Sequence, residues 1–516
     1  MENITTRLPC VIQRNGCNGE HLVASRPIRE GELIFQEKPL VTGPLGVAFC
    51  EPKAFSTCLG CYKTIPSLYR CSKCGFPVCG LQCENMPDHA NYECKIFAES
   101  PVNPVVNPSE YEKIKILRIL LLKEKCPEKW KLIQSLESRE SIRRQNFCAV
   151  ATDIALYKFI KQECHLTEYD FDELHHVSGV SFIHSFPTNC PDVSDSPNHV
   201  SAARYASLLF YNASLLSHDC FPNTRYAIHA SSGKNSSYSI SVIATRNIAE
   251  GEPVTTSYVD PTLGTFERRE ILRERYYITC TCERCSDASE FNTFYSAIKC
   301  KNLDCHSGYL LPIFPLDSNS EWRCNKNCSE MPTSPNWIAS LIQEVRSQAS
   351  MSHSWETFDD MLEKYRTTVL HRNHYLVVEM QVELLKMIEK FIHQVESSQQ
   401  IPLAKKMVEL SRSSLAVMDV IYPGCNTFRG RLLYYLHEGL LALCLSRVNE
   451  CADKTDQEIV RKSCKKHFVE ALEIIREARE ILLLESVGTI DWKNGTILST
   501  ESPRIKSLMA FFSFKN

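Results

Sequence analysis

The sequence lacks an apolar run long enough to cross a bilayer. Its most apolar stretch, Ile114 to Leu122, is short and contains Lys115 and Arg118, whereas a spanning helix needs about 20 largely apolar residues. The N-terminus, Met1 to Cys10, also lacks the apolar region of a secretory signal peptide. We therefore expect an intracellular protein, in the cytoplasm or the nucleus, with no membrane partner.

An excess of charge of either sign is missing as well. The 516 residues include 58 basic and 61 acidic side chains, a net charge of −3. Without a global positive field, the sequence does not indicate direct binding of nucleic acid. It also lacks a dinucleotide-binding glycine motif, a Walker A loop, a His-Glu-x-x-His pair and a Gly-x-Ser-x-Gly elbow. Nucleotide hydrolysis, dehydrogenase chemistry and zinc-protease chemistry are therefore poor hypotheses.

Cysteine, in contrast, is abundant, with 26 residues. Short Cys-x2-Cys spacings and the missing secretory signal favour thiolate–metal sites over disulfides. The densest segment offers eight ligands: Cys58, Cys61, Cys71, Cys74, Cys79, Cys83, His89 and Cys94. Zinc takes four ligands in a tetrahedron, so eight ligands predict two ions. Each ion would stabilise this small segment by about 10–16 kcal/mol; the alternative is a set of unligated thiols.

Residues 58–94 (the finger) resemble the MYND zinc finger. That resemblance implies interleaved ions, one held by Cys58, Cys61, Cys79 and Cys83 and the other by Cys71, Cys74, His89 and Cys94. One departure is visible, because four residues separate His89 from Cys94 where the family usually has three. MYND fingers usually bind peptides, often proline-rich ones, so the resemblance implies a protein or peptide partner.

Strand-like patterns lie on both sides of the finger. Apolar residues alternate through 19–35 and again through 240–258, each with a Glu-Gly turn. Between them lies Ser217-His218-Asp219-Cys220-Phe221-Pro222-Asn223, and Cys280-x-Cys282-x2-Cys285 follows. This order of motifs resembles a SET domain interrupted by a MYND finger, as in the SET-and-MYND (SMYD) family, with the arthropod-type branch nearest. The resemblance runs from about residue 8 to 290 and more loosely to the C-terminus.

The family resemblance implies transfer of a methyl group from S-adenosylmethionine to a lysine of a histone or another protein. A free lysine has a pKa of about 10.4, so neutralising it near pH 7.4 costs about 4 kcal/mol, and a narrow, dry channel lowers that cost. The resemblance assigns Tyr258 to position the amine; the alternative is a half-buried strand tyrosine. It also implies a third zinc, held by Cys220, Cys280, Cys282 and Cys285.

Several cofactor positions differ from the family pattern. The positions that the resemblance assigns to the cofactor are Gly19, Glu20, His184, Ser217, His218, Tyr258, Tyr277 and Ile278. Glu20 places a negative charge near the cofactor carboxylate, and His184 and Ser217 stand where the family has asparagine. Ile278 replaces an aromatic residue that stacks on adenine, and Tyr277, if on a strand, would face the other way. Since each lost contact costs about 1–2 kcal/mol, a non-catalytic scaffold that binds partner peptides is the alternative function.

The remaining regions carry weaker signals. Four cysteines within residues 300–328 (the ribbon) predict a zinc ribbon that holds a fourth ion. They are Cys300, Cys305, Cys324 and Cys328. The alternative is that these four thiols bind no metal. Helical periodicity within 100–175 matches the helical insert of the family, and we expect Arg143 and Arg144 to lie on its solvated face. The periodic stretches of 333–516 predict antiparallel helices, and the family resemblance suggests a tetratricopeptide-like array.

Together these observations predict an α+β fold. Its units are residues 5–50 (N-terminal part of SET), 58–94 (MYND finger), 100–200 (helical SET insert), 201–258 (C-terminal SET core), 259–290 (post-SET zinc segment), 300–328 (possible zinc ribbon) and 333–516 (helical, TPR-like domain).

Overall fold

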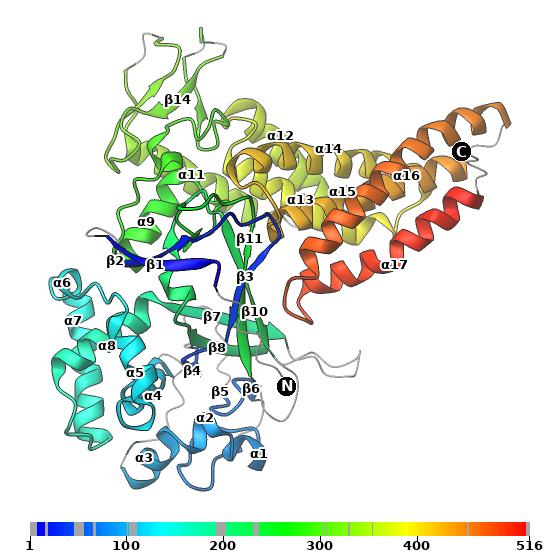
Figure 1. Ribbon diagram of the computed structural model, residues 1–516. Helices are drawn as coiled ribbons and strands as arrows, with labels where there is room; N and C mark the ends of the chain where they lie inside the picture. The colour runs from blue at the N-terminus through cyan, green and yellow to red at the C-terminus, as the bar shows by residue number, and fades with distance from the viewer. Residues whose placement is uncertain are drawn as a thin grey trace.

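The structure is a computed structural model. It describes residues 8–15, 19–45, 56–65, 69–100, 102, 111–191, 203–230, 237–302, 304–305, 307–328, 331–352, 354–450 and 454–511. Strands occupy the centre of Figure 1, helical and finger segments lie below them, and a stack of C-terminal helices extends to one side. The predicted α+β fold, with a helical C-terminal region, is confirmed.

The central strands form several small sheets. The strands are β1 (Cys10–Asn15), β2 (Gly19–Ala24), β3 (Leu33–Glu37), β4 (Val41–Pro44), β7 (Ser185–Pro191), β8 (Ala203–Leu209), β9 (Ser217–His218), β10 (Thr224–Ala230), β11 (Tyr238–Ala244) and β12 (Thr255–Thr256). β1 pairs with β2, β11 lies between β10 and β3, and β8 lies between β4 and β7. The short strand β12 runs parallel to β9. This last pairing brings Ser217 and His218 close to Tyr258.

The finger and the helical insert separate two strands that are neighbours in space. β4 pairs with β8, although both insertions lie between them in the sequence. Strand β7, which lies within the predicted insert of residues 100–200, pairs with β8 in this sheet. Helix α4 (Tyr111–Lys125) packs so closely on β4 that a Cβ atom at Gly43 would lie 2.5 Å from the Cβ of Lys115. A larger residue at 43 would push the insert off the sheet.

Two short strands and three short helices are described in and beside the finger, and helices make up most of the described part of the insert. Their elements are β5 (Ser56–Thr57), β6 (Thr64–Ile65), α1 (Leu81–Glu84), α2 (Pro87–Ala90), α3 (Glu93–Glu99), α5 (Pro127–Ser135), α6 (Glu140–Arg143), α7 (Phe147–Lys158) and α8 (Phe171–Ile183). Asp170 and Glu173 form a capping box at the start of α8. The expectation for Arg143 is wrong, since its side chain is buried and binds Asp153 at 2.8 Å. A buried carboxylate from α7, invisible in the local charge pattern, draws it inward.

The post-SET segment and the ribbon follow the last SET strand. Their elements are α9 (Thr265–Tyr276), α10 (Glu283–Ser286), β13 (Ile298–Lys299), β14 (Tyr309–Pro312) and β15 (Trp322–Cys324), and the last three form one small sheet. Along α9, Arg268, Leu272 and Tyr276 form the buried stripe, at a spacing of four residues. One face of α9 therefore packs on the SET core and leaves another for the ribbon side.

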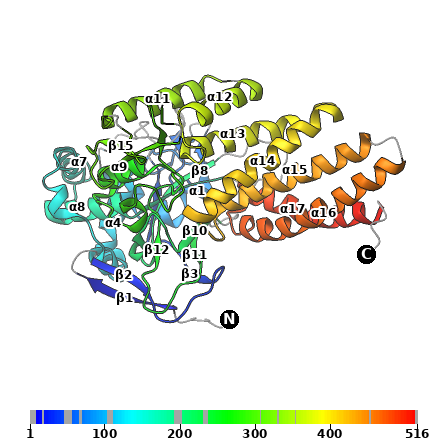
Figure 2. The same cartoon turned by 90° about the horizontal axis from the view of Figure 1, so that it is seen from above.

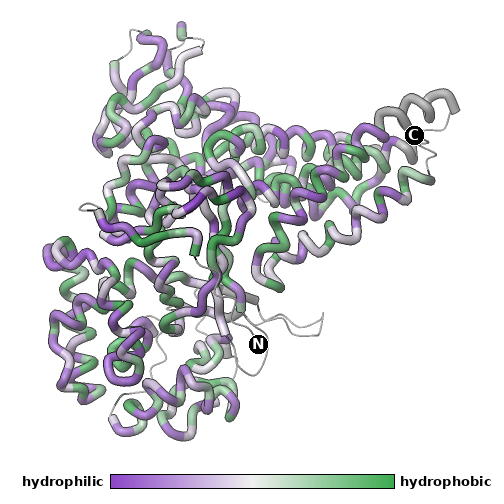
Figure 3. The backbone as a smooth tube through the Cα atoms, viewed as in Figure 1, coloured by the Kyte–Doolittle hydropathy of each residue, from purple (hydrophilic) through white to green (hydrophobic). Residues whose placement is uncertain are grey.

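The C-terminal helices stack in sequence order. They are α11 (Pro335–Ser350), α12 (Trp355–Thr368), α13 (Tyr375–Ile392), α14 (Ser397–Ile421), α15 (Thr427–Glu450), α16 (Lys454–Leu482) and α17 (Ile490–Phe511). Each packs on the next, as Figure 2 shows from above. Apolar and polar stretches alternate along them in Figure 3, as expected for helices that bury one stripe.

A buried arginine joins this helical stack to the SET strands. Arg225 of β10 donates to Glu485 at 2.6 Å and to the carbonyl of Ile481 at 2.9 Å. Gly424 lies against the SET side as well, with φ +84°, and a Cβ there would meet the Thr245 carbonyl oxygen at 1.7 Å. Among the residues described, no helix is long and apolar enough to span a membrane.

Candidate active site and metal centres

The finger brings its eight predicted ligands together in two interleaved groups. Cys58, Cys61, Cys79 and Cys83 form one group and Cys71, Cys74, His89 and Cys94 the other, with all ligand atoms of a group within 4.8 Å of one another. Four thiolates around zinc lie about 3.8 Å apart, given Zn–S bonds of ~2.3 Å in a tetrahedron. The Sγ atoms of Cys71 and Cys94 are 3.7 Å apart, so the donor set fits zinc. Two of the four residues between His89 and Cys94, Asn91 and Tyr92, lie between α2 and α3.

A third group joins two distant segments. Cys220 lies with Cys280, Cys282 and Cys285, and its Sγ is 3.9 Å from that of Cys280 and 3.5 Å from that of Cys285. Buried guanidinium groups surround these sulfurs. Arg284 donates to the Cys220 carbonyl at 3.2 Å, and Arg268 approaches Cys285 Sγ at 3.9 Å. Four thiolates around Zn²⁺ carry net negative charge, which these arginines would offset.

The ribbon supplies a fourth group of donors. Cys300, Cys305, Cys324 and Cys328 converge, and the Sγ atoms of Cys305 and Cys324 are 3.7 Å apart. Gly308 lies so close that a Cβ there would be 2.3 Å from the Cys324 sulfur. The donor chemistry and spacing of all four groups fit structural zinc ions, and zinc occupancy itself stays a prediction.

A cavity of about 620 Å³ opens between the SET strands and the helical insert. Six of the eight positions predicted for the cofactor line it: Gly19, Glu20, His184, Ser217, Tyr258 and Ile278. They come from β2, the end of α8, β9, the segment after β12 and the segment after α9. The residues between Ser135 and Arg144 close the insert side. The structure therefore gathers in one place residues that lie up to 259 positions apart in the sequence.

Arg139 is the feature of this cavity that sequence reasoning missed. It has a left-handed backbone, with φ 54°, and its backbone N–H donates to Glu137 Oε1 at 2.8 Å. Its Nε is buried and has no hydrogen-bond partner, and among the described residues no carboxylate forms an ion pair with it. The cavity thus contains an unpaired cation. No periodicity distinguishes Arg139 from the charged residues around it, so the sequence offered no signal.

Tyr258 lies where the cavity meets the SET core. Its hydroxyl donates to the Leu216 carbonyl at 2.6 Å. Burial raises the pKa of Tyr258 to about 12, against a smaller opposite effect of the Arg139 charge, so the phenol is neutral at physiological pH. The His184 ring is buried 2.9 Å from the Glu137 carbonyl, and burial lowers the pKa of His184 to about 4. This histidine is therefore a neutral wall of the cavity.

Two predicted cofactor residues do not line the cavity. The His218 ring turns away: its Nδ1 accepts from the Tyr258 N–H at 3.1 Å, and its Nε2 lies 3.3 Å from Cys220 Sγ. It thereby links the tyrosine to the third metal group, while its predicted backbone contact with the cofactor stays a prediction. Tyr277 does not lie on a strand. It ends α9 in a left-handed conformation, φ 54°, and the reversal that follows delivers Ile278 to the cavity instead.

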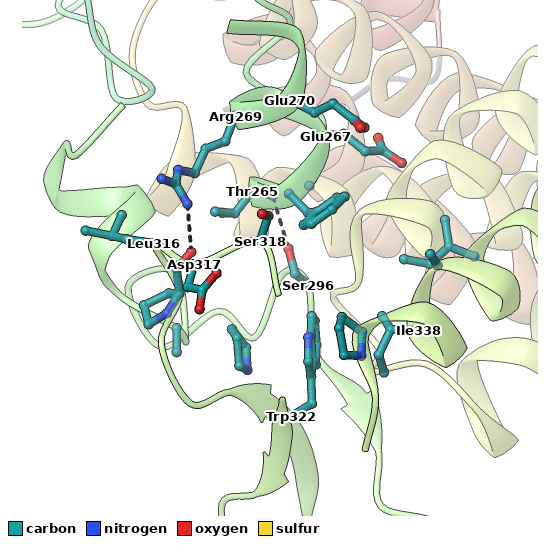
Figure 4. A pocket seen from close by; sticks show the side chains of 18 of the residues that line it. Thr265, Glu267, Arg269, Glu270, Ser296, Leu316, Asp317, Ser318, Trp322 and Ile338 are labelled. Atoms are coloured by element: carbon teal, nitrogen blue, oxygen red, sulfur yellow. Dashed lines mark hydrogen bonds between the residues drawn. The ribbon is translucent and has the colours of Figure 1, made fainter. Parts of the chain in front are cut away.

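A second cavity, of about 500 Å³, lies on the ribbon side of α9 (Figure 4). Apolar side chains of the ribbon and of α11 line it, including Trp322 and Ile338. Trp322 is 9% exposed and points into the cavity; within the described residues its indole N–H has no acceptor. Glu267, on the facing side, is already bound to Arg346 at 3.0 Å. The cavity therefore offers an apolar surface and one indole N–H that has no acceptor among the described residues.

Comparisons with known proteins agree with this geometry. Residues 19–259 match the family model of the SET domain. The chain is 28% identical over 316 residues to the SET domain-containing protein SmydA-8, isoform A, of Drosophila melanogaster, covering 59% of this chain and 62% of that protein. It is 23% identical over 450 residues to the histone-lysine N-methyltransferase ASHR1 of Arabidopsis thaliana, covering 84% and 86%.

Vertebrate proteins are similar over a shorter region. The N-lysine methyltransferase SMYD2 of Gallus gallus is 27% identical over 280 residues, covering 52% of this chain and 58% of that protein. The alignments thus span less than two thirds of SmydA-8 and of SMYD2. A solved SET domain of LSMT bound to lysine and AdoHcy aligns over 88% of this chain and 94% of its own at 13% identity. Its TM-score of 0.31 is too low to bear on the fold.

Proposed function

Because the chain belongs to the SET-and-MYND family, we propose that it is an S-adenosylmethionine-dependent protein-lysine N-methyltransferase. The observation that carries the proposal is the convergence of Tyr258 and the unpaired Arg139 on one cavity with five other predicted cofactor positions. We propose histones or other intracellular proteins as substrates.

The cavity residues suit the polar end of the cofactor. S-adenosylmethionine has a carboxylate and an ammonium group, and when bound it supplies an electrophilic methyl group. Arg139 would hold the carboxylate, because its half-buried guanidinium, whose Nε is buried without a hydrogen-bond partner, gains from pairing with an anion. Glu20 and Glu137, which line the same cavity, would face the ammonium group. The charge at Glu20, unfavourable next to a carboxylate alone, is thus offset by an arginine that the sequence pattern concealed.

The core side of the cavity suits the lysine. The Leu216 carbonyl and the Tyr258 hydroxyl are 2.6 Å apart and would both accept hydrogen bonds from an entering amine. Burial disfavours the charged ammonium form, so the amine would reach the methyl group neutral. Two fixed acceptors would then hold its lone pair toward the methyl group. The third metal group, tied to Tyr258 through His218, would keep these acceptors in place.

Replacing Arg139 with alanine should weaken cofactor binding. A charge-assisted hydrogen bond contributes about 1.5–3 kcal/mol, so we expect affinity for S-adenosylmethionine to fall about 10- to 150-fold. Calorimetry on the zinc-loaded chain, with S-adenosylhomocysteine alongside, measures this directly.

The matched control for this experiment is Arg144→Ala. Arg144 also lines the cavity, but Glu140 and Asp172 already bind its guanidinium. Its loss should change affinity by less than about threefold. If wild-type chain shows no binding up to millimolar cofactor, the enzyme proposal fails. If Arg139→Ala and Arg144→Ala change the affinity for S-adenosylmethionine equally, Arg139 does not bind the cofactor.

The second cavity favours a second candidate function, a scaffold that binds partner peptides. An apolar wall with a free indole N–H is how grooves for proline-rich segments are built, since the donor takes a carbonyl of the extended peptide. Trp322 would donate to that carbonyl, and Ile342 of α11 would contact the peptide side chains. This role needs no cofactor, and the two functions can coexist.

A ten-residue polyproline peptide tests the scaffold role. We expect it to bind the full chain, and Ile342→Arg, which fills the cavity with charge, should lower its affinity at least about tenfold. Fluorescence anisotropy of the labelled peptide provides the measurement. Ile490→Arg, at a residue 75% exposed on α17, is the control. If the peptide binds Ile342→Arg as tightly as it binds wild type, its site lies on another surface, such as the finger.

A further inference from the structure

His89 belongs to the second metal group of the finger and has two differently placed ring nitrogens. Its Nε2 faces the group, 3.7 Å from Cys74 Sγ, and its Nδ1 lies 2.8 Å from Glu93 Oε1. The side chains of His89 and Glu93 are both fully buried. A carboxylate behind a ligating histidine fixes the tautomer and the ring plane of that ligand and raises its basicity. Glu93 is therefore placed to orient a zinc ligand.

Glu93 is in turn held by a residue from outside the finger. Arg118 of α4 donates from Nε to Glu93 Oε2 at 2.7 Å and from a terminal nitrogen to Oε1 at 2.6 Å. This two-pronged geometry is specific for a carboxylate. Because the arginine side chain is only 2% exposed, its charge has no water to replace the carboxylate. Removing either partner would leave the other as an uncompensated buried charge.

The rest of the guanidinium binds two other parts of the fold. It donates to the Tyr62 hydroxyl at 2.6 Å and the Leu59 carbonyl at 3.1 Å in the finger. It also donates to the Thr42 carbonyl of β4 at 3.0 Å. One side chain of the insert thus touches the finger, a SET strand and the carboxylate behind a metal ligand. Sequence reasoning used Arg118 only as a charge that excludes a membrane span.

We propose that Arg118 and Glu93 are positioning residues for the second zinc of the finger, and that they couple retention of this ion to the docking of the finger on the SET strands and the insert. Glu93 holds the His89 ring in its binding orientation, and Arg118 compensates the buried charge of Glu93. Arg118 is itself held in place by α4, to which it belongs, and by its contact with β4. By linkage, loss of the ion releases the same contacts and loosens α4. The finger is therefore not an independent module.

Zinc release from the Glu93→Gln variant tests this coupling. The amide oxygen can still accept a hydrogen bond. The amide has no charge, so it cannot form the two-pronged ion pair with Arg118 or raise the basicity of His89 as the carboxylate does. Loss of such a partner lowers metal affinity about 10- to 100-fold, so one zinc of the full chain should transfer to a chromogenic chelator about 10- to 100-fold faster than in wild type. The cobalt-loaded variant should also show a shifted d–d absorption band from its Cys3His site, which a purely structural role would leave unchanged.

Two further variants complete the test. Arg118→Lys keeps the charge but not the two-pronged contact, and it should accelerate release of the same ion even if Glu93→Gln does not fold. Glu173→Gln breaks a partly exposed ion pair with Lys123 on the same helix α4, and it should leave zinc release unchanged. Equal zinc release and unshifted cobalt spectra in Arg118→Lys and wild type would overturn the proposal. These readouts require no methyltransferase activity.

Discussion

Replacing Tyr258 with phenylalanine is expected to lower the methylation rate by about 100-fold or more, because the amine would lose one of its two acceptors and its alignment. Cofactor affinity should change little, since the tyrosine lies at the core side of the cavity, away from Arg139's proposed contact with the carboxylate. Transfer of labelled methyl groups to protein extracts measures the rate, and calorimetry measures the affinity.

The control must remove a similar hydrogen bond elsewhere. Tyr169 provides it, because its hydroxyl donates to the Leu120 carbonyl at 3.1 Å inside the insert. Each replacement should lower the free energy of unfolding by about 1 kcal/mol, but only Tyr258→Phe should lower the methylation rate by about 100-fold or more. Equal activity in the two variants would show that Tyr258 is a structural tyrosine. A large loss of cofactor affinity would place it in the cofactor site instead.

The grouping of the metal ligands was predictable from the sequence, including one cluster with distant parts. Spacing alone indicates which cysteines lie close together along the chain, and the family resemblance supplied the pairing of Cys220 with a triplet that begins 60 residues later at Cys280. Zinc chemistry explains this success, because few arrangements satisfy four tetrahedral donors. The helices of the C-terminal region were also visible, since each buries a periodic apolar stripe.

Buried charges were not predictable in the same way. Arg143 was expected on a solvated face and Arg118 only as a charge within the most apolar stretch. Each is buried against a carboxylate from another element, Glu93 for Arg118 and Asp153 for Arg143. A charged side chain is buried only when a partner compensates its desolvation. Those partners lie 25 and 10 positions away in the sequence, and no periodic pattern links them.

Backbone reversals account for the other failures. Tyr277 was included among the cofactor positions, although on a strand it would face away from the side of Ile278. The left-handed turn at the end of α9 has the same outcome by another route, and only Ile278 lines the cavity. Arg139 likewise owes its direction to a left-handed φ. Such conformations are uncommon in residues other than glycine, so sequence reasoning had no reason to place them here.

Replacing Cys220 with serine should lower the zinc content from four ions to three and loosen the post-SET segment. The hydroxyl is a poor zinc ligand, and three remaining cysteines close together leave the ion with an incomplete tetrahedron. Because a structural site stabilises its surroundings by about 10–16 kcal/mol, α9 and α10 should lose protection against hydrogen exchange. Methylation should fall with them, since His218 links Cys220 to the backbone of Tyr258. Metal analysis and hydrogen exchange provide the measurements.

Cys425→Ser is the matched control for this variant. Cys425 is a half-buried cysteine that belongs to none of the four groups, and its thiol donates to the Ala244 carbonyl at 3.3 Å. Serine can keep that bond, so zinc content and exchange in α9 should stay as in wild type. An unchanged zinc count in Cys220→Ser would mean that another ligand completes the third site. If the wild-type chain contains three zinc ions, the ribbon does not bind zinc. The Cys220→Ser variant should then contain two zinc ions.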